Sequence, residues 1–169
     1  VRKAADGTFE TTVENGDVYR SPAVIVTAGG TPVKLEVPGE FEYAGKGVSY
    51  CAICDGAFFK GHTITVVGGG DAACEEADFL TRYADKVYII HRRQEFRASM
   101  IVQNRVFANP KIEVIWDTVV DAIVGDGTLM THAKLRNAKS GATRELAATG
   151  MFIFVGFKPN TGVIEGHVE

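Results

Sequence analysis

The stretch HTITVVGGGDAA, at residues 62–73, decides the fold of this chain. It begins as a β-branched, mainly apolar run and passes directly into a turn of three glycines. Residues 71–83 then place alanine and leucine side chains on one face at helical spacing, and residues 87–90 form a second apolar run. This order predicts strand, tight turn, helix and strand, which is the opening unit of a parallel α/β sheet.

The rest of the pattern predicts a three-layer, Rossmann-like dinucleotide-binding domain. Apolar strands buried on both faces indicate a parallel sheet with helices on one side, and a β-meander after the third strand covers the other side. We expect the further elements of this domain to be a helix over 96–107, strands over 112–116, 118–124, 129–135 and 151–156, and a turn at 138–142. Ahead of it we expect a hairpin of strands 8–13 and 18–20 about Asn15-Gly16, and a buried strand over 23–28.

Composition limits the classes of partner. The chain has 169 residues, is 46% hydrophobic and 23% charged, and carries a net charge of −3. Because phosphate binding favours basic faces, this mildly acidic balance argues against nucleic acid as a partner. No apolar run approaches the roughly 18 residues of a membrane span, and no signal peptide opens the chain. A Cys-x-x-Cys pair in such a chain indicates a reducing compartment, so we expect a cytoplasmic location and no membrane partner.

The glycine turn meets the dinucleotide fingerprint G-x-G-x-x-G/A with Gly68, Gly70 and Ala73. The first glycine permits the tight turn, the second lets the backbone approach a pyrophosphate, and the small third residue lets helix pack on strand. Asp71 is discordant beside a phosphate site and can serve as the helix N-cap instead. The alternative is an ordinary tight turn between strand and helix. We predict that the turn binds a cofactor through Gly68, Gly69, Gly70, Asp71, Ala72 and Ala73.

The end of the second apolar run indicates which dinucleotide is bound. An NAD site usually places an acid there, about 20 residues beyond the glycines, to bind the ribose 2′-hydroxyl. Here the chain reads His91-Arg92-Arg93, followed by Arg97, with no acid before Glu95. Guanidinium groups bind a 2′-phosphate that a carboxylate would repel. This favours NADPH, and the alternative is a solvated basic patch.

Cys51 and Cys54 form a Cys-x-x-Cys pair followed at once by Asp55. Half of a zinc site would need a second ligand pair at metal spacing, which Cys74 and the histidines do not form, so we predict no metal. Two buried structural thiols would not explain the adjacent acid. We therefore favour redox chemistry, in which one thiolate attacks a disulfide, the other resolves it, and the acid manages protons. Cys74 is more simply a packing residue.

In this order and spacing the motifs resemble one family, the NADPH-dependent, flavin-containing thioredoxin reductases of the low-molecular-weight bacterial and archaeal type. The resemblance covers essentially the whole chain and implies the pyridine nucleotide-disulfide oxidoreductase fold. It rests on TAGGTP at 27–32, PGE at 38–40, GVSYCAICDG at 47–56, GGGDAA at 68–73, HRR at 91–93, FRA at 96–98, FIFVG at 152–156 and PNT at 159–161.

The resemblance implies a route for electrons from NADPH to FAD, then to the Cys-x-x-Cys disulfide, and on to thioredoxin. It implies that Cys54 faces the flavin, that Cys51 attacks the substrate disulfide, and that Asp55 is the proton donor or acceptor. Arg92, Arg93 and Arg97, with His91 beside them, are implied to hold the 2′-phosphate. The family is homodimeric.

The chain departs from the family pattern at both ends. It has neither the first glycine fingerprint for FAD nor the Gly-Asp motif for flavin. We therefore expect residues 1–44 to be a remnant of the FAD domain with a connector, 45–158 to be the NADPH-binding domain, and 159–169 to begin the return to the FAD domain. Such a module should bind NADPH and not turn over alone. The alternatives are a catalytically silent nucleotide-binding module and a related flavoprotein reductase for a glutaredoxin-like or peroxidase partner.

Overall fold

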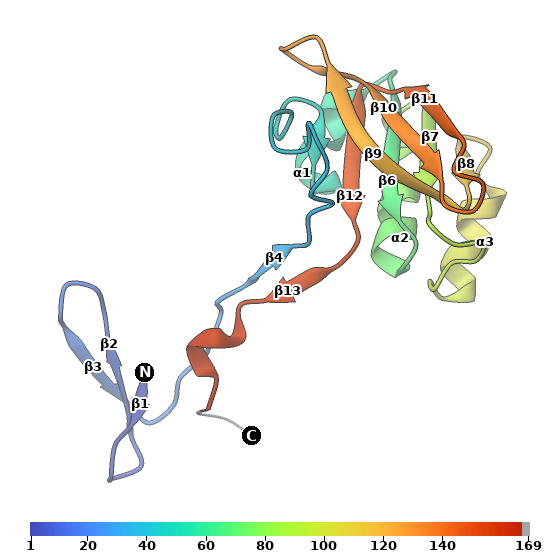
Figure 1. Ribbon diagram of the computed structural model, residues 1–169. Coiled ribbons are helices and arrows are strands. Elements are labelled where there is room, and N and C mark those ends of the chain that lie inside the picture. The colour runs from blue at the N-terminus through green and yellow to red at the C-terminus, as the bar shows by residue number, and fades with distance from the viewer. Residues whose placement is uncertain (167–169) are drawn as a thin grey trace. The chain divides into compact units, whose positions relative to one another are not determined.

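A five-stranded parallel sheet forms the centre of the larger of two units, Pro32–Gly156, in a computed structural model that describes residues 1–166 (Figure 1). The strands run in the spatial order β5 (Val48–Ser49), β12 (Gly150–Phe154), β6 (Thr63–Gly68), β7 (Lys86–Ile90) and β8 (Ile112–Ile115). All neighbouring pairs are parallel. The pairing places β6 at the centre of the sheet, in agreement with its almost wholly buried sequence.

Helices cover one face of this sheet and a meander covers the other (Figure 1). The helices are α2 (Asp71–Leu80) and α3 (Met100–Ala108), and the antiparallel meander consists of β9 (Thr118–Gly125), β10 (Met130–Asn137) and β11 (Thr143–Ala147). Alternate residues of one strand serve the two cores: Val66 packs with the helices and Val67 packs with the meander. The predicted three-layer, Rossmann-like architecture is confirmed.

The segment ahead of α3 differs from the sequence prediction, which began the helix at residue 96. Phe96 is buried in the core on the helix side of the sheet, and the helix begins only at Met100. The backbone N–H of Arg97 donates to the Gly69 carbonyl, and that of Ser99 donates to the Asp71 carboxylate. In a helix beginning at residue 96 the Ser99 N–H would bind the Glu95 carbonyl, but it binds Asp71 instead and that carbonyl accepts from His91.

Short elements missing from the prediction surround the dithiol. Helix α1 (Ala52–Asp55) and the 3-10 helix η1 (Gly56–Phe59) follow the two-residue strand β5. The meander strand β11 was also not predicted, because its sequence is polar and mostly exposed. None of the helices among residues 1–166 combines the length and apolarity that a membrane crossing needs.

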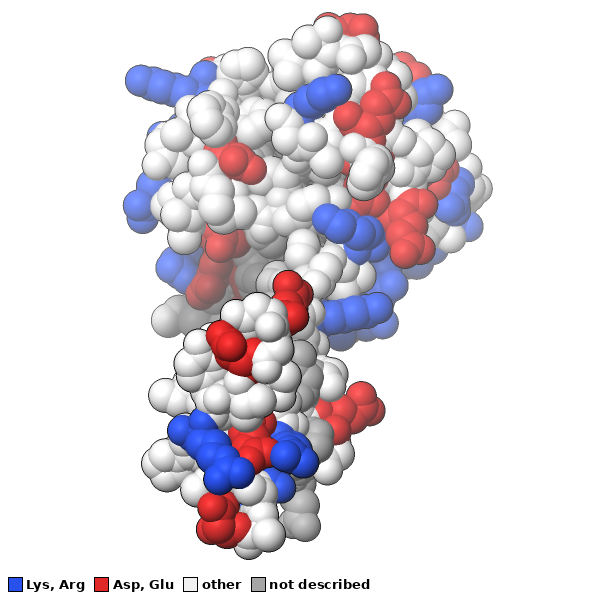
Figure 2. All heavy atoms as spheres, turned by 90° about the vertical axis from the view of Figure 1, so that its left-hand side faces the viewer, with Lys and Arg blue, Asp and Glu red and all other residues white. Residues whose placement is uncertain are grey.

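The smaller unit contains Val1–Thr31 and the residues after Gly156. It holds an antiparallel sheet of β1 (Arg2–Lys3), β2 (Phe9–Thr12) and β3 (Val18–Ser21), and the 3-10 helix η2 (Thr161–Ile164). Its strand β13 (Phe157–Pro159) pairs with β4 (Gly30–Pro32), whose last residue is the first of the larger unit. The predicted hairpin about Asn15-Gly16 is confirmed. Acidic and basic side chains lie together in this unit (Figure 2), where the Glu10 carboxylate accepts hydrogen bonds from Arg2 and Arg20.

The predicted buried strand over 23–28 is wrong. These residues form no strand, and Ile25 is 89% exposed. An apolar run becomes a strand only when a neighbouring strand pairs with it, and no described strand lies beside this one. The contacts place the boundaries of the two units after Thr31 and after Gly156. The predicted domain limits of 1–44, 45–158 and 159–169 stay a prediction.

Phe152 tests the core on the helix side of the sheet. Its side chain is fully buried in β12 and meets the Phe59 ring edge-on at a centroid distance of 5.3 Å. We expect Phe152→Ala to lower the free energy of unfolding by about 3–5 kcal/mol, because it removes the buried ring and leaves a cavity. Urea denaturation followed by Trp116 fluorescence measures the change. The control is Phe41→Ala, which removes a ring that is 96% exposed; equal losses from the two variants would contradict the packing described.

Candidate functional site

The glycine turn is shaped by a close approach of strand, helix and neighbouring strand. Gly68 ends β6 with a φ of 149°, and a Cβ there would lie 2.4 Å from the Phe154 carbonyl oxygen and 2.6 Å from the Ala73 Cβ. Only a glycine at 68 and a small residue at 73 allow this packing. A Cβ on Gly70, the N-cap of α2, would meet nothing within 4 Å. The backbone at Gly70 therefore faces open space, where the first N–H groups of α2 can receive an anion.

Asp71 has a different role from the N-cap that its position suggested. It is the first residue of α2, while Gly70 is the N-cap. Its Oδ1 accepts a hydrogen bond of 2.8 Å from the backbone N–H of Ser99, which precedes α3. That N–H lowers the pKa of the Asp71 carboxyl. The carboxylate thus joins the starts of the two helices, and the N-cap interpretation is wrong.

The three arginines of the second motif lie at the surface beside this turn. Arg92, Arg93 and Arg97 are all exposed, and none forms an ion pair within the described part of the chain. The backbone N–H of Arg97 donates to the Gly69 carbonyl at 2.8 Å. This hydrogen bond holds the arginine segment, residues 92–97, against the turn. Three guanidinium groups without acidic partners beside an open helix N-terminus suit a phosphate-rich ligand.

His91 is placed differently from the arginines. Its side chain is 7% exposed, and its Nε2 donates to the Glu95 carbonyl at 3.0 Å. A Cβ on Gly69 would lie 2.3 Å from the imidazole, so the ring lies directly against the turn. Burial lowers the pKa of His91, which favours the neutral ring. The structure therefore places His91 as a support for the turn and brings the arginines, not the imidazole, to the surface.

Cys51 and Cys54 are joined as a disulfide at the start of α1. Cys51 is the N-cap of this helix, and its Sγ accepts a hydrogen bond of 3.2 Å from the Cys54 backbone N–H. Cys54 is exposed and Cys51 is half-buried. A thiolate at Cys51 would therefore face the N–H groups of a helix start, an arrangement that stabilises the anion.

Ser49 is a residue of this site that sequence reasoning missed. Its buried hydroxyl donates to Asp55 Oδ2 at 2.5 Å and accepts from the Cys51 backbone N–H at 3.1 Å. The Ser49 hydroxyl thereby holds the Asp55 carboxylate close to the Cys51 backbone. The one available signal was a hydroxyl in a buried strand next to the dithiol, since a buried hydroxyl needs a partner. The identity of that partner depends on how α1 turns, which the sequence pattern does not reveal.

A cavity of about 430 Å³ opens next to this hydrogen-bonded pair. Ser49 and Asp55 line it together with Phe58, Leu129 and Met130. The Phe58 side chain is 79% exposed and that of Leu129 is 55% exposed. On the face of the molecule seen in Figure 2, uncharged side chains cover much of the larger unit between separated charged groups. The dithiol therefore lies beside an accessible, partly apolar surface.

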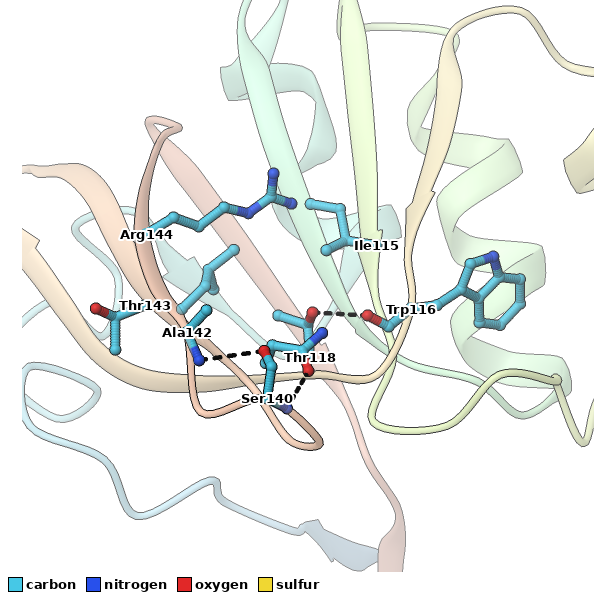
Figure 3. Close-up of a pocket in the computed structure, with 9 residues that line it drawn as sticks. Ile115, Trp116, Thr118, Ser140, Ala142, Thr143 and Arg144 are labelled. Atoms are coloured by element: carbon cyan, nitrogen blue, oxygen red, sulfur yellow. Dashed lines mark hydrogen bonds between the residues drawn. The ribbon is translucent and has the colours of Figure 1, made fainter.

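A second cavity, of about 310 Å³, lies at the end of β8 under the meander (Figure 3). Its wall includes Ile115, Thr118 and Arg144, and Figure 3 shows the Arg144 side chain extending toward Ile115. The Thr118 hydroxyl donates to the Trp116 carbonyl at 2.7 Å. None of the predicted site residues lines this cavity.

The structure brings together two of the three predicted motifs. The arginine segment and the glycine turn share the Arg97–Gly69 hydrogen bond. The dithiol instead follows the edge strand β5, which β12 separates from β6. In the described part of the chain, no hydrogen bond joins the dithiol to the glycine turn.

Comparison with known proteins places the chain among disulfide oxidoreductases. The family model for pyridine nucleotide-disulphide oxidoreductases matches residues 2–168. Thioredoxin reductase from Listeria monocytogenes is 46% identical over 162 residues, covering 95% of this chain and 51% of the relative. The enzyme from Streptomyces clavuligerus is 52% identical over 154 residues, covering 91% of this chain and 48% of the relative. The chain therefore spans about half the length of these relatives.

Solved structures agree with this result. Thioredoxin reductase from Lactococcus lactis superposes with a TM-score of 0.87 at 43% identity, covering 93% of this chain and 52% of that one. Thioredoxin reductase from T. acidophilum gives a TM-score of 0.86 at 34% identity, covering 94% of this chain and 52% of that one.

Cys74 should behave differently from the dithiol. It is fully buried in α2, and burial, with Asp71 and Glu75 nearby, raises the pKa of its thiol to about 11. Since only the thiolate reacts, we expect iodoacetamide at pH 8 to modify Cys51 and Cys54 after reduction and to leave Cys74 unmodified until the chain unfolds. Mass spectrometry of tryptic peptides measures this. Rapid labelling of Cys74 in the folded chain would contradict its burial, and Cys74→Ala should leave the labelling of the other two unchanged.

Proposed function

Because the chain belongs to the pyridine nucleotide-disulphide oxidoreductase family, we propose that it is the NADPH-binding and redox-dithiol part of a thioredoxin reductase. The observation that carries this is the combination of an open glycine turn with an arginine segment that forms no ion pair among the described residues, in one chain with a Cys51–Cys54 disulfide. Homologous thioredoxin reductases of similar sequence and fold support the assignment.

The nucleotide site we propose fits NADPH on three grounds. The N-terminus of α2 at Gly70 receives the pyrophosphate, because its N–H groups and dipole favour an anion. Arg92, Arg93 and Arg97 bind the 2′-phosphate through charged hydrogen bonds. His91 acts from beneath the turn, where it holds Gly69 and the arginine segment in place.

The dithiol passes two electrons to a disulfide partner. The Cys51 thiolate attacks one partner sulfur and forms a mixed disulfide, and the other partner sulfur leaves as a thiolate that takes a proton. The Cys54 thiolate then attacks the Cys51 sulfur, which releases the second partner thiolate and restores the Cys51–Cys54 disulfide. Asp55, held by Ser49, exchanges the protons. By resemblance to the family, FAD in the whole protein supplies the redox chemistry that links the nucleotide to the disulfide.

We assign thioredoxin as the partner from two observations. The similar proteins are named thioredoxin reductases. The cavity beside Ser49 and Asp55 is rimmed by the exposed side chains of Phe58 and Leu129, which give an apolar docking surface next to the dithiol. A homodimer and a cytoplasmic location complete the proposal for the whole protein. A glutaredoxin-like or peroxidase partner is the alternative within the same chemistry, and a silent nucleotide-binding module is the alternative outside it.

Isothermal titration calorimetry tests the nucleotide assignment. We expect the chain to bind NADPH more tightly than NADH, and Arg92→Ala to weaken NADPH binding by roughly tenfold or more while leaving NADH binding unchanged, because a charged hydrogen bond contributes about 1.5–3 kcal/mol. Arg105→Ala is the control, since this exposed arginine pairs with Glu75 on the outer surface of the helices. Equal affinities for NADPH and NADH would refute the 2′-phosphate site.

His91→Gln separates a supporting role from direct phosphate binding. If the imidazole supports the turn, the variant weakens NADPH and NADH by a similar factor and keeps their ratio. A loss confined to NADPH would show that the imidazole contacts the 2′-phosphate.

Exchange with oxidised thioredoxin tests the dithiol assignment. We expect the reduced chain to lose two thiols as thioredoxin gains two, and Cys54→Ser to trap a mixed disulfide through Cys51, because the resolving thiolate is missing. Non-reducing electrophoresis and peptide mass spectrometry identify the trapped species, with Cys51→Ser as the control that traps none. Failure of the chain to re-form its disulfide would favour the silent module. Faster exchange with a glutaredoxin than with thioredoxin would favour the alternative partner.

A further inference from the structure

Glu40 is a buried carboxylate that the proposed function does not use. It is 4% exposed and lies in the segment that leads from the start of the larger unit to the dithiol. Its Oε1 accepts from the Leu35 N–H at 3.1 Å and from the Tyr50 hydroxyl at 2.7 Å, and its Oε2 accepts from the Glu36 N–H at 2.6 Å. Both oxygens are therefore satisfied without a cation, by donors from two separate stretches of chain.

Tyr50 connects Glu40 to the redox site. It lies between Ser49, which binds the Asp55 carboxylate, and Cys51, the N-cap of α1. Its ring is half-buried, and the Lys34 Nζ lies 3.2 Å from the ring centroid. Burial is the main cause, and the neighbouring Glu40 the second, of a raised pKa for the Tyr50 hydroxyl. The phenol therefore stays protonated and remains a hydrogen-bond donor.

The segment that carries Glu40 is itself fixed on the meander. The Ile123 N–H donates to the Pro38 carbonyl at 2.9 Å. Gly39 has a φ of 84°, and a Cβ there would lie 1.9 Å from the Ile123 carbonyl oxygen. Backbone and β9 are thus in close contact immediately before Glu40. Because the backbone before Glu40 is held against β9, the Glu40 carboxylate can fix the position of the Tyr50 side chain; a carboxylate on a mobile loop could not.

We propose that Glu40 is a positioning residue that holds Cys51 within disulfide-forming reach of Cys54. Its carboxylate binds the Tyr50 hydroxyl and so ties the Ser49–Cys51 backbone to residues 35–36 and, through residue 38, to β9. The role rests on the proposed redox function of the dithiol. The competing interpretation is a buried glutamate that only satisfies the N–H groups of a loop and stabilises the fold.

A positioning role predicts a change in the thiol–disulfide equilibrium. Reduction by glutathione breaks the Cys51–Cys54 bond, takes two electrons and two protons from two reduced glutathione molecules, and yields the dithiol and oxidised glutathione. When the two thiols are held together, their effective concentration is high and the disulfide is favoured. If Cys51 is released from its anchor, the effective concentration falls and the equilibrium shifts toward the dithiol.

Glu40→Gln and Tyr50→Phe in the whole chain test the proposal. Glutamine keeps the size of the side chain but turns an NH₂ group toward one of the backbone donors, and phenylalanine removes only the hydroxyl. We expect each variant to raise the equilibrium constant for reduction by glutathione by about tenfold, which corresponds to about 30 mV. The double variant should change it little further, because both substitutions interrupt the same link from residues 35–36 through Glu40 to Tyr50. Thiol alkylation and mass spectrometry across a series of glutathione buffers measure the constant.

Glu42→Gln is the matched control, because Glu42 is exposed in the same segment and its side chain forms no hydrogen bond or ion pair among the described residues. Amide exchange at Leu35 and Glu36 should accelerate in Glu40→Gln and not in the control. If Glu40→Gln lowers the melting temperature but leaves the equilibrium constant equal to that of Glu42→Gln, the positioning role is refuted. If Glu40→Gln does not fold, an unchanged constant in Tyr50→Phe refutes it equally. Failure of the unmodified chain to exchange would instead refute the redox function itself.

Discussion

The close approach of β6, α2 and β12 at Gly68 is the contact on which the larger unit depends. Gly68 lies against both the Ala73 side chain and the Phe154 carbonyl, so any side chain at position 68 would force the helix away from the sheet. The same approach opens the N-terminus of α2 at Gly70. Packing and the proposed ligand binding thus rest on one geometric constraint, because the turn that lets helix meet strand is also the turn that leaves backbone N–H groups facing outward.

The arrangement of strands sets how the two chemical groups can cooperate. The glycine turn follows β6 and the dithiol follows β5, with β12 between them. The proposed nucleotide site at the turn and the disulfide at the sheet edge are thus separate sites on one scaffold. This separation is consistent with a third redox group between them, which is the role that the family resemblance implies for FAD in the whole protein. The chain spans about half the length of its relatives, so a flavin between the two sites is proposed only for the whole protein.

The sequence predicted those features that local patterns specify. The β6–turn–α2 unit, the layered α/β architecture and the Asn15-Gly16 hairpin follow from hydrophobic period and turn chemistry, which act over a few residues. Features that depend on distant partners were missed. Among the described residues the apolar run 23–28 has no neighbouring strand, and α3 begins four residues late because the Ser99 N–H binds Asp71 in place of a helical carbonyl. Ser49 and Glu40 lie within two of the family motifs, but their roles were missed because their hydrogen-bond partners are fixed only by the fold.

The buried polar residues around the site share a physical logic. Ser49, Glu40 and His91 are each almost fully covered; Ser49 and Glu40 are satisfied by neighbours from more than one position in the chain, and His91 donates to the Glu95 carbonyl. Burying such groups costs free energy unless every partner is in place, so each one is satisfied in only one arrangement of its neighbours. An apolar residue of similar size would pack in several arrangements. Each buried polar residue therefore fixes the position of one part of the site. Ser49 positions Asp55, Glu40 positions the backbone that leads to the dithiol, and His91 supports the glycine turn. Of the groups proposed to react or bind, Cys54 and the three arginines are exposed and Cys51 is half-buried.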